Sequence, residues 1–260
     1  MSSIDFQPWP KIARLNRDIT ITEKIDGTNA AVVIVPAIIQ QGTGWGMIES
    51  LTNAGQPVIS LRDNNVTAEE IGAVALVESD DWLIRHAVFA QSRTRFITQK
   101  NDNYGFAAWV QRNAEALVET LDAGTHFGEW WGNGIQRKYG EPRKHFSLFN
   151  TAAWGDFDHP DTNSTDLMDD DVPALGVVPV LYQGPYSQEA IDTALESLRR
   201  NGSYASPGWG TDYATGKAAA EGIVIFHHAS REMYKITFEG DESPKAIPRD
   251  QHGNALEAAA

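Results

Sequence analysis

The stretch Glu23-Lys24-Ile25-Asp26-Gly27-Thr28-Asn29 places a lysine at the mouth of a strand, because the apolar β-formers of residues 30–35 follow it directly. Asp26 and Gly27 are typical of a tight turn, since glycine tolerates backbone conformations that other residues avoid. We therefore expect the amine of Lys24 to be held on rigid scaffold. A lysine held in this way can attack a phosphorus or a carbonyl carbon once it has lost its proton. The alternative interpretation of this segment is a charged hairpin tip.

The composition excludes several classes of protein. The 260 residues contain no cysteine, so disulfides, thiolate zinc sites and cysteine nucleophiles are excluded. No apolar stretch has the length of a membrane span, and the N-terminus has no secretory signal. We therefore expect a cytoplasmic protein with no membrane partner. The adjacent His227 and His228 would point to opposite faces of a strand, and we interpret them as structural.

The charge of the chain is unevenly spread. The net charge is −14, whereas enzymes of nucleic acids usually carry a basic surface. Residues 155–172 include seven acids and no basic residue, which predicts a solvated loop. The local field of a cleft can outweigh net charge, and we expect weak, salt-sensitive binding to RNA. The basic residues gather in two clusters, Arg93, Arg95 and Lys100, and Arg137, Lys138, Arg143 and Lys144.

Hydrophobic periodicity predicts two helices among many short strands. Apolar residues at helical spacing predict one helix over residues 105–121, and Ser187 caps a second that ends at Asn201-Gly202. A glycine-rich turn covers residues 41–46, and sheet-like segments follow it. Short strands with a few helices indicate an α+β fold built on antiparallel sheet. The other predicted strands are 88–91, 146–150, 177–181, 222–226 and 233–238.

The string EKIDGTN resembles motif I (KxDG) of the covalent nucleotidyltransferases, in the form typical of the RNA ligase 2 family. Segments resembling the later motifs of that family follow in the order it requires. The segment HFGEWWGNGIQR is the most specific of them, because no common structural motif demands it. The segments are SRTR and DNYGF at 92–106, HFGEWWGNGIQR at 126–137, FSLFN at 146–150, EGIVI at 221–225 and MYKITF at 233–238.

The resemblance implies a role for individual residues. Lys24 would take AMP from ATP, Glu129 would accept a hydrogen bond from the ribose, and Phe149 would stack on adenine, although a phenylalanine there also suits a core. Glu221 would support a catalytic Mg²⁺ or Mn²⁺ ion. The full set of nucleotide contacts would be Glu23, Lys24, Asn29, Arg93, Glu129, Phe149 and Lys235, with Arg93, Arg95, Arg137 and Lys138 as candidate RNA contacts.

Two positions depart from the family's pattern. Asn150 stands where the family often has aspartate, and motif V has the single lysine Lys235 where the family often has two. Trp130 and Trp131, within motif III, also suit core packing. The resemblance implies a nucleotidyltransferase (ATP-grasp-like ligase adenylylation) domain over residues 1–245, without an OB domain. Residues 246–260 would form a C-terminal tail.

The function that the resemblance implies is ATP-dependent ligation of RNA ends. Lys24 would form a covalent lysyl-AMP, AMP would pass to an RNA 5′-phosphate, and a 3′-hydroxyl would displace AMP. Because a lysine amine is normally protonated at neutral pH, the site must favour its neutral form. The alternatives are an ATP-dependent DNA ligase, a capping-type guanylyltransferase and a catalytically silent module that binds nucleotides or RNA.

Overall fold

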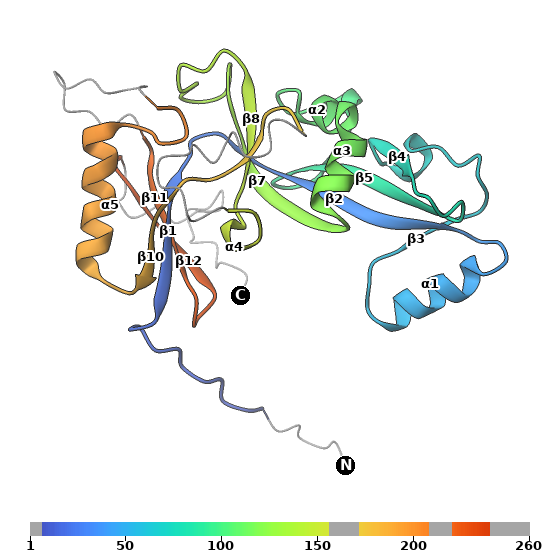
Figure 1. Ribbon diagram of the computed structural model, residues 1–260, viewed down its shortest axis with the longest axis horizontal. Helices are drawn as coiled ribbons and strands as arrows, with labels where there is room; N and C mark the ends of the chain where they lie inside the picture. Colours follow the sequence, from blue (N-terminus) through green and yellow to red (C-terminus); the bar gives the residue numbers. More distant parts are fainter. Residues whose placement is uncertain (1–6, 156–171, 208–219, 240–260) are drawn as a thin grey trace, which may run out of the picture.

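Two β-sheets make up the body of the protein, and the chain passes between them after β1 and again after β9. The computed structural model describes residues 7–155, 172–207 and 220–239. Figure 1 shows an elongated molecule in which the small sheet, with α5 beside it, lies at one end and the large sheet extends to the other. The chain passes from β1 (Asp18–Lys24) in the small sheet to β2 (Thr28–Ile39) in the large sheet. The crossing therefore places residues 25–27 between the two sheets.

The small sheet has the strand order β10-β1-β11-β12, and all its pairings are antiparallel. The other strands are β10 (Val180–Pro185), β11 (Gly222–His227) and β12 (Glu232–Thr237). Helix α5 (Gln188–Asn201) packs on one face, where Ile19 and Ile21 meet Ile191 and Leu198. Because alternate residues of a strand point to opposite faces, Lys24 lies on the face that is turned away from α5.

The large sheet has the order β4-β5-β2-β7-β8-β9, with β3 paired to β2 and β6 to β5. The β2–β3 and β8–β9 pairings are parallel and the others are antiparallel. Its remaining strands are β3 (Ile59–Leu61), β4 (Ala75–Glu78), β5 (Ile84–Ser92), β6 (Phe96–Ile97), β7 (Gly124–Gly132), β8 (Lys144–Leu148) and β9 (Leu175–Val177).

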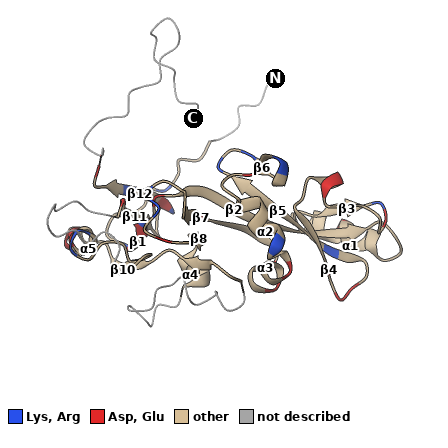
Figure 2. Cartoon of the chain, turned by 90° about the horizontal axis from the view of Figure 1, so that it is seen from above, with Lys and Arg blue, Asp and Glu red and all other residues tan. Residues whose placement is uncertain are grey.

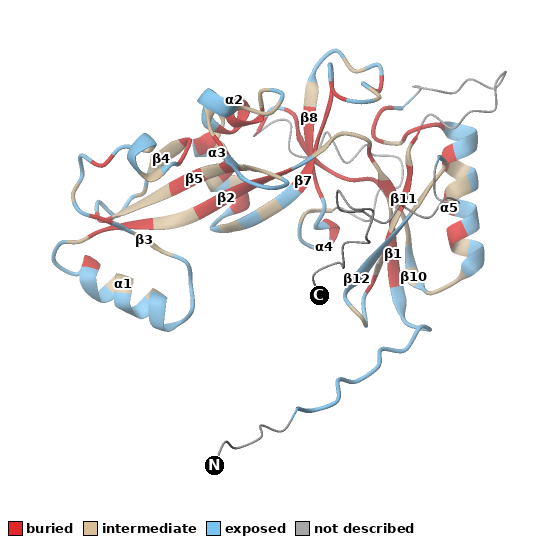
Figure 3. Ribbon diagram, turned by 180° about the vertical axis from the view of Figure 1, so that it is seen from behind, coloured by how far each residue is buried: buried red, intermediate tan, exposed pale blue. Residues whose placement is uncertain are grey.

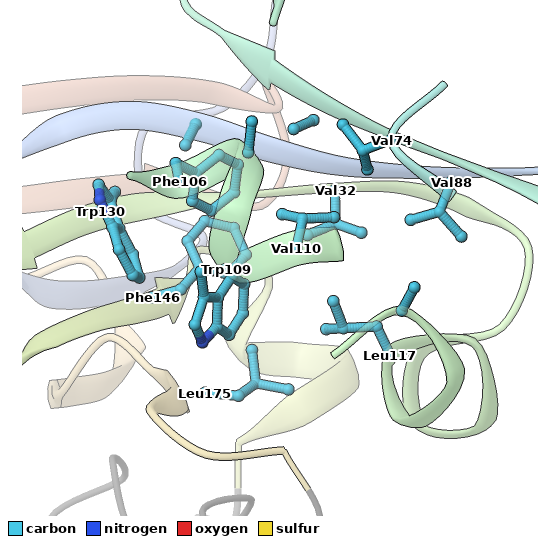
Figure 4. Close-up of a cluster of buried hydrophobic side chains, with 14 of the residues drawn as sticks. Val32, Val74, Val88, Phe106, Trp109, Val110, Leu117, Trp130, Phe146 and Leu175 are labelled. Atoms are coloured by element: carbon cyan, nitrogen blue, oxygen red, sulfur yellow. The ribbon is translucent and has the colours of Figure 1, made fainter. Parts of the chain in front are cut away.

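Helices α2 (Phe106–Arg112) and α3 (Ala114–Leu121) cover one face of the large sheet and enclose its core. The rings of Phe106 and Trp130 have centroids 5.3 Å apart, and those of Phe106 and Phe146 are 5.0 Å apart (Figure 4). Trp131 is fully buried in a smaller cluster and donates a hydrogen bond to Ser147 Oγ at 2.9 Å. Both tryptophans of motif III are therefore core residues.

Short helical segments complete the described chain. They are α1 (Gly44–Asn53), α4 (Thr151–Trp154) and the 3₁₀ turns Glu69–Ile71 and Gln99–Asn101. Asn150, which departs from the family's pattern, caps α4 by accepting a hydrogen bond from the backbone N–H of Ala153. Within the described residues, the helices are too short or too polar to cross a membrane.

The α+β class and its antiparallel sheets are confirmed, and α5 begins and ends where predicted. Three predictions of elements were wrong. The helix expected over 105–121 is two helices, because the chain turns at Asn113. The segment after the glycine-rich turn, expected to be sheet-like, forms α1, which already begins at Gly44 within that turn. The strand expected at 177–181 is divided between β9 and β10, which belong to different sheets.

Two further sequence predictions concern single segments. His227 is buried between Ser230 and the backbone carbonyl of Leu15, and His228 contacts Thr20, so both histidines have structural partners as expected. The acidic loop falls mostly in residues 156–171, and the tail at 246–260 follows residue 239, so both predictions lie outside the described residues.

Candidate active site

Lys24 is the last residue of β1, and the backbone then crosses to the other sheet. Its β11 partner is Gly222, next to Glu221. The residues after Lys24 do not form a hairpin, since β1 and β2 belong to different sheets. Gly27 has an ordinary φ, and its need for glycine is a matter of space: an added Cβ would lie 2.5 Å from the carbonyl oxygen of Trp130 and 2.8 Å from the Trp131 Cβ.

The amine of Lys24 is paired with the carboxylate of Glu221. Lys24 Nζ donates to Glu221 Oε2 at 2.6 Å, and the two side chains are 24% and 20% exposed. The pairing of Lys24 with Gly222 across β1 and β11 explains this contact, because it brings the end of one strand to the start of the other. A partly exposed lysine is thus held by a carboxylate that could receive its proton.

Glu129 lies opposite Asn29 in the pairing of β7 with β2. One carboxylate oxygen accepts the backbone N–H of Gly27 at 3.1 Å, and the other accepts Asn29 Nδ2 at 2.8 Å. Burial raises the pKa of Glu129 to about 7, against the opposing influence of Lys24. Each carboxylate oxygen has a second lone pair, so Glu129 can fix the crossing and still accept a ligand hydroxyl.

Asp26 is held by two residues of the loop after β7. Its backbone N–H donates to Tyr139 Oη at 2.7 Å, and its carboxylate accepts Arg137 Nε at 3.0 Å. Tyr139 is fully buried, which raises the pKa of its phenol and keeps it protonated. Arg137, a candidate RNA contact, is engaged with Asp26 in the described structure. Its guanidinium positions the crossing.

Glu23, a predicted nucleotide contact, points away from Lys24 and is not brought together with the other predicted residues. The side chain is 1% exposed, and its carboxylate accepts Ser203 Oγ at 2.6 Å and the backbone N–H groups of Tyr204 and Ala205 at 2.7 and 3.1 Å. Alternation along β1 explains this orientation, because consecutive residues face opposite sides. Burial outweighs these hydrogen bonds and raises the pKa of Glu23 to about 7.

Lys235 shares a face of the small sheet with Lys24. Lys235, in β12, lies opposite Val224 of β11. Val224 in turn lies opposite Thr22 of β1, two residues before Lys24. Residues directly opposite one another in an antiparallel sheet point to the same side. The exposed amine of Lys235 is therefore on the side of the sheet where Lys24 lies.

Phe149 and Arg93 follow β8 and β5, the strands that lie beside β7 and β2 in the large sheet. Phe149, directly after β8, is 40% exposed, and its backbone N–H bonds to the carbonyl oxygen of Phe127. Arg93 is exposed directly after Ser92, which pairs with Ala30 beside Asn29. Two further candidates for RNA contacts, Arg95 and Lys138, are also exposed.

The donors for a divalent metal are few. Among the described residues, no group of three or more histidine and acidic side chains is placed to hold an ion. Glu221 and Glu129 lie close enough for the charge of Glu221 to raise the pKa of Glu129. Mg²⁺ usually takes one or two carboxylates together with substrate phosphates and water. Glu221 fits such a shared site, as its carboxylate is partly exposed.

Of the two residues that hold Asp26, sequence reasoning missed Tyr139 and singled out Arg137 for a different role, as an RNA contact. Tyr139 reaches Asp26 across 113 positions of sequence and Arg137 across 111. The signal present in the sequence was a dense set of glycine, basic and aromatic residues at 132–140, which overlaps the end of motif III and continues beyond it. Several of these adopt positive φ, including Gln136 (39°), Lys138 (62°) and Tyr139 (50°). A backbone so shaped brings Arg137 and Tyr139 to the same turn.

The arrangement combines a nucleophile with groups that can handle charge. Lys24 supplies an amine, Glu221 an acceptor for its proton, and Lys235 a second cation on the same face. The crossing that carries Lys24 is fixed through Gly27, Asn29 and Asp26, so the amine has a defined position. Chemically, this set suits attack on an electrophile that carries negative charge, as a phosphate ester does.

Comparison with solved structures finds RNA ligases of Naegleria gruberi. A mutant of that ligase with ATP and Mn is 13% identical, with a TM-score of 0.43, and the match covers 86% of this chain and 51% of the other. The same ligase with PPi is 14% identical with a TM-score of 0.41, and the match covers 85% of this chain and 50% of the other. This chain thus spans about half the length of these structures. No curated protein matches the sequence.

A family comparison covers most of the chain. The sequence matches the family described as RNA ligase over residues 17–243, a range that contains β1 to β12 and every residue of the site. The match agrees with the resemblance carried by residues 23–238. The chain belongs to the RNA ligase family.

Proposed function

We propose that the protein is an ATP-dependent RNA ligase that works through a lysyl-AMP on Lys24. The observation that carries the proposal is the 2.6 Å pair of Lys24 and Glu221 at the junction of β1 and β11, in a chain of the RNA ligase family. A surface lysine paired with a carboxylate is common, but this one ends a strand whose following residues are fixed by Glu129 and Tyr139. A lysine whose backbone is held in this way is better suited to react with a bound substrate than a lysine that moves freely in solvent.

In the first step, Lys24 Nζ attacks the α-phosphorus of ATP. A nitrogen–phosphorus bond forms, the bond from the α-phosphorus to the bridging oxygen breaks, and pyrophosphate leaves. The proton of the ammonium passes to Glu221, its hydrogen-bond partner. Lys235, on the same face, offsets charge that grows on the phosphoryl oxygens. Phe149 and Glu129 would hold the adenine and the ribose.

A divalent ion fits beside Glu221, whose carboxylate is partly exposed. When bound, Mg²⁺ or Mn²⁺ supplies positive charge that disfavours the ammonium form of Lys24 and neutralises the phosphate oxygens. Glu221 is already engaged by Lys24 in the described structure. The carboxylate of Glu221 therefore lies between Lys24 and the place that the ion would take.

In the later steps AMP passes from Lys24 to an RNA 5′-phosphate, and a 3′-hydroxyl then displaces AMP to seal the backbone. Asn29 and Arg93 are our candidates for contacts with the phosphate and sugar. They lie at neighbouring strand ends, because Ser92, just before Arg93, pairs with Ala30, just after Asn29. Asn29 is oriented by Glu129, and Arg93 is exposed and free to meet a substrate from solvent.

The test is intact-mass analysis after incubation with ATP and magnesium. We expect the mass of one AMP to be added, in an acid-labile bond, and to be lost in Lys24→Ala. GTP in place of ATP tests for a capping enzyme, and matched RNA and DNA nicks separate the two kinds of ligase. An adduct that persists in Lys24→Ala would refute the mechanism, and an adduct without any sealing would refute the ligase function.

A further inference from the structure

The N-terminal arm, residues 7–17, is the part of the described chain that the proposed mechanism does not use. It forms no helix or strand and lies before β1. Figure 1 shows it leading away from the start of β1 and from both sheets. In Figure 3 the arm is pale blue, the colour of exposed residues. Trp9 and Ile12 are each 85% exposed, and Leu15 is 61% exposed.

The arm is firmly attached at its root and free beyond it. The carbonyl oxygen of Arg17 accepts the backbone N–H of Tyr186, and the carbonyl oxygen of Leu15 bonds to His227 Nε2 at 2.9 Å. Within the described part of the chain, residues 7–14 have no hydrogen bond or ion pair. The arm therefore has a fixed origin and a surface that is available to another molecule.

The charge of the arm is opposite to that of the protein. Its sequence, QPWPKIARLNR, has three cations, Lys11, Arg14 and Arg17, and no acid, in a chain whose net charge is −14. Figure 2 shows a body that is mostly uncharged, with basic and acidic residues of both signs in scattered short segments. An unbalanced basic segment is suited to phosphate, since each cation that meets a phosphate releases counterions. The exposed indole of Trp9 adds a surface on which a base can stack.

The reach of the arm matches the distance to the site. Strand β1 runs from the root of the arm to Lys24, and at about 3.3 Å per residue it is roughly 20 Å long. An extended segment from Leu15 back to Trp9 also spans about 20 Å. Between the two ends, the face that carries Lys24 also carries Lys235 and the 69% exposed Met233. A strand of RNA that leaves Lys24 along this face comes within reach of the arm.

We propose that residues 7–17 bind the RNA substrate, with Lys11 and Arg14 on backbone phosphates and Trp9 stacked on a base. The inference rests on the proposed ligase function, which identifies the substrate as RNA. The rest of the enzyme is acidic and has few basic residues for RNA phosphates, and the arm supplies such residues. The arm contacts backbone phosphates and the face of a base, and every nucleotide has both. It therefore binds RNA without regard to sequence.

The experiment measures binding and adenylylation separately. Fluorescence anisotropy with a nicked RNA duplex bearing a 5′-phosphate, without ATP, gives affinity across a salt series. The double variant Lys11→Ala with Arg14→Ala should weaken binding by roughly tenfold or more and reduce the slope of log K against log salt by about two. Trp9→Ala should weaken it by about tenfold and Trp9→Phe much less, because a phenyl ring still stacks.

A matched control removes two cations elsewhere. Arg112 ends α2 and Arg200 lies near the end of α5, both exposed, and their double substitution by alanine changes the net charge equally. We expect it to leave the salt slope unchanged. Adenylylation by ATP should stay within twofold of the unmodified protein in all these variants.

Three outcomes would overturn the proposal. The arm variants could match the Arg112 and Arg200 control in affinity and slope. The arm variants could lose adenylylation activity while RNA binding is unchanged, which would assign the cations to the phosphates of ATP. Sedimentation could instead show that the arm holds two copies together while RNA binding is unchanged. A failure of the ligase function itself would appear differently, as the absence of an AMP adduct on the unmodified protein.

Discussion

Tyr139 Oη lies 2.7 Å from the backbone nitrogen of Asp26, two residues after Lys24. The hydroxyl accepts the N–H of a residue in the crossing between the sheets, from a ring that is fully buried beside Ile25 and Trp131. The position of Lys24, the proposed nucleophile, therefore depends on a residue of the β7–β8 loop. This relationship makes Tyr139 a positioning residue, because it acts on Lys24 through the backbone.

Tyr139→Phe should slow adenylylation more than it weakens ATP binding. Loss of the hydroxyl leaves the Asp26 N–H without this partner, at a cost of about 1–3 kcal/mol in the free energy of unfolding. A small displacement of the amine should lower the rate of adduct formation roughly ten- to hundredfold. Rapid-quench measurement over a range of ATP separates kcat from KM. Tyr182→Phe is the control, since that hydroxyl bonds to Pro185 within β10. A change in KM alone would contradict the positioning role.

Glu221→Ala and Lys235→Ala should each reduce the adenylylation rate by roughly 10²–10³. The reason is that both groups act on charge that changes during the transfer: Glu221 holds the ammonium of Lys24, and Lys235 lies on the same face. Neither side chain is buried in a core, so the midpoint of thermal unfolding should move little. Adduct formation at the unmodified rate in either variant would show that the residue has been assigned to the wrong motif.

Gly27→Ala should destabilise the fold at the crossing. The added methyl would lie 2.5 Å from the carbonyl oxygen of Trp130 and 2.8 Å from the Trp131 Cβ, and backbone cannot yield as a flexible side chain does. We expect a loss of about 1–3 kcal/mol in the free energy of unfolding, measured with urea. Gly46→Ala is the matched control, because its Cβ meets nothing within 4 Å and it lies in α1. Equal stability of the two variants would refute the close approach.

The sequence predicted elements well where local signals agreed. Ser187, the apolar stripe of α5 and Gly202 all indicate the same helix, and that helix is present with those ends. The apolar run after Lys24 forms β2 as predicted, whereas Lys24 itself ends β1, a strand that was not predicted. The motifs also identified Glu129 and Glu221, whose side chains the structure brings to the crossing.

Where tertiary contacts decide, the sequence was a poor guide. Asn113 interrupts a periodic apolar pattern, because its own side chain bonds to the carbonyl oxygen of Trp109. Helix α1 begins among glycines, which have low helix propensity. Glu23 was placed with its neighbour Lys24 on motif evidence, although alternation alone puts it on the opposite face. The partners of Asp26 lie more than a hundred residues away, and no local signal encodes that pairing.

Glu23 should make the stability of the protein depend on pH. Its pKa is about 7 in the folded protein against an ordinary 4.5, because burial disfavours the charged form. The folded state therefore binds this proton more tightly than the unfolded state. The resulting stability is fully present below pH 4.5 and is lost as the pH rises to about 7, by up to about 3 kcal/mol.

Glu23→Gln removes the titration, so its free energy of unfolding should fall less between pH 5 and 7.5 than that of the unmodified protein. The comparison of slopes is needed, because the amide cannot accept all the donors that Ser203, Tyr204 and Ala205 present and is less stable at every pH. Urea titrations at several pH values give both slopes. Glu232→Gln, an exposed acid of β12, controls for the change of charge. Parallel slopes for Glu23→Gln and the unmodified protein would mean that the Glu23 carboxyl is ionised throughout this range, held so by its three hydrogen bonds.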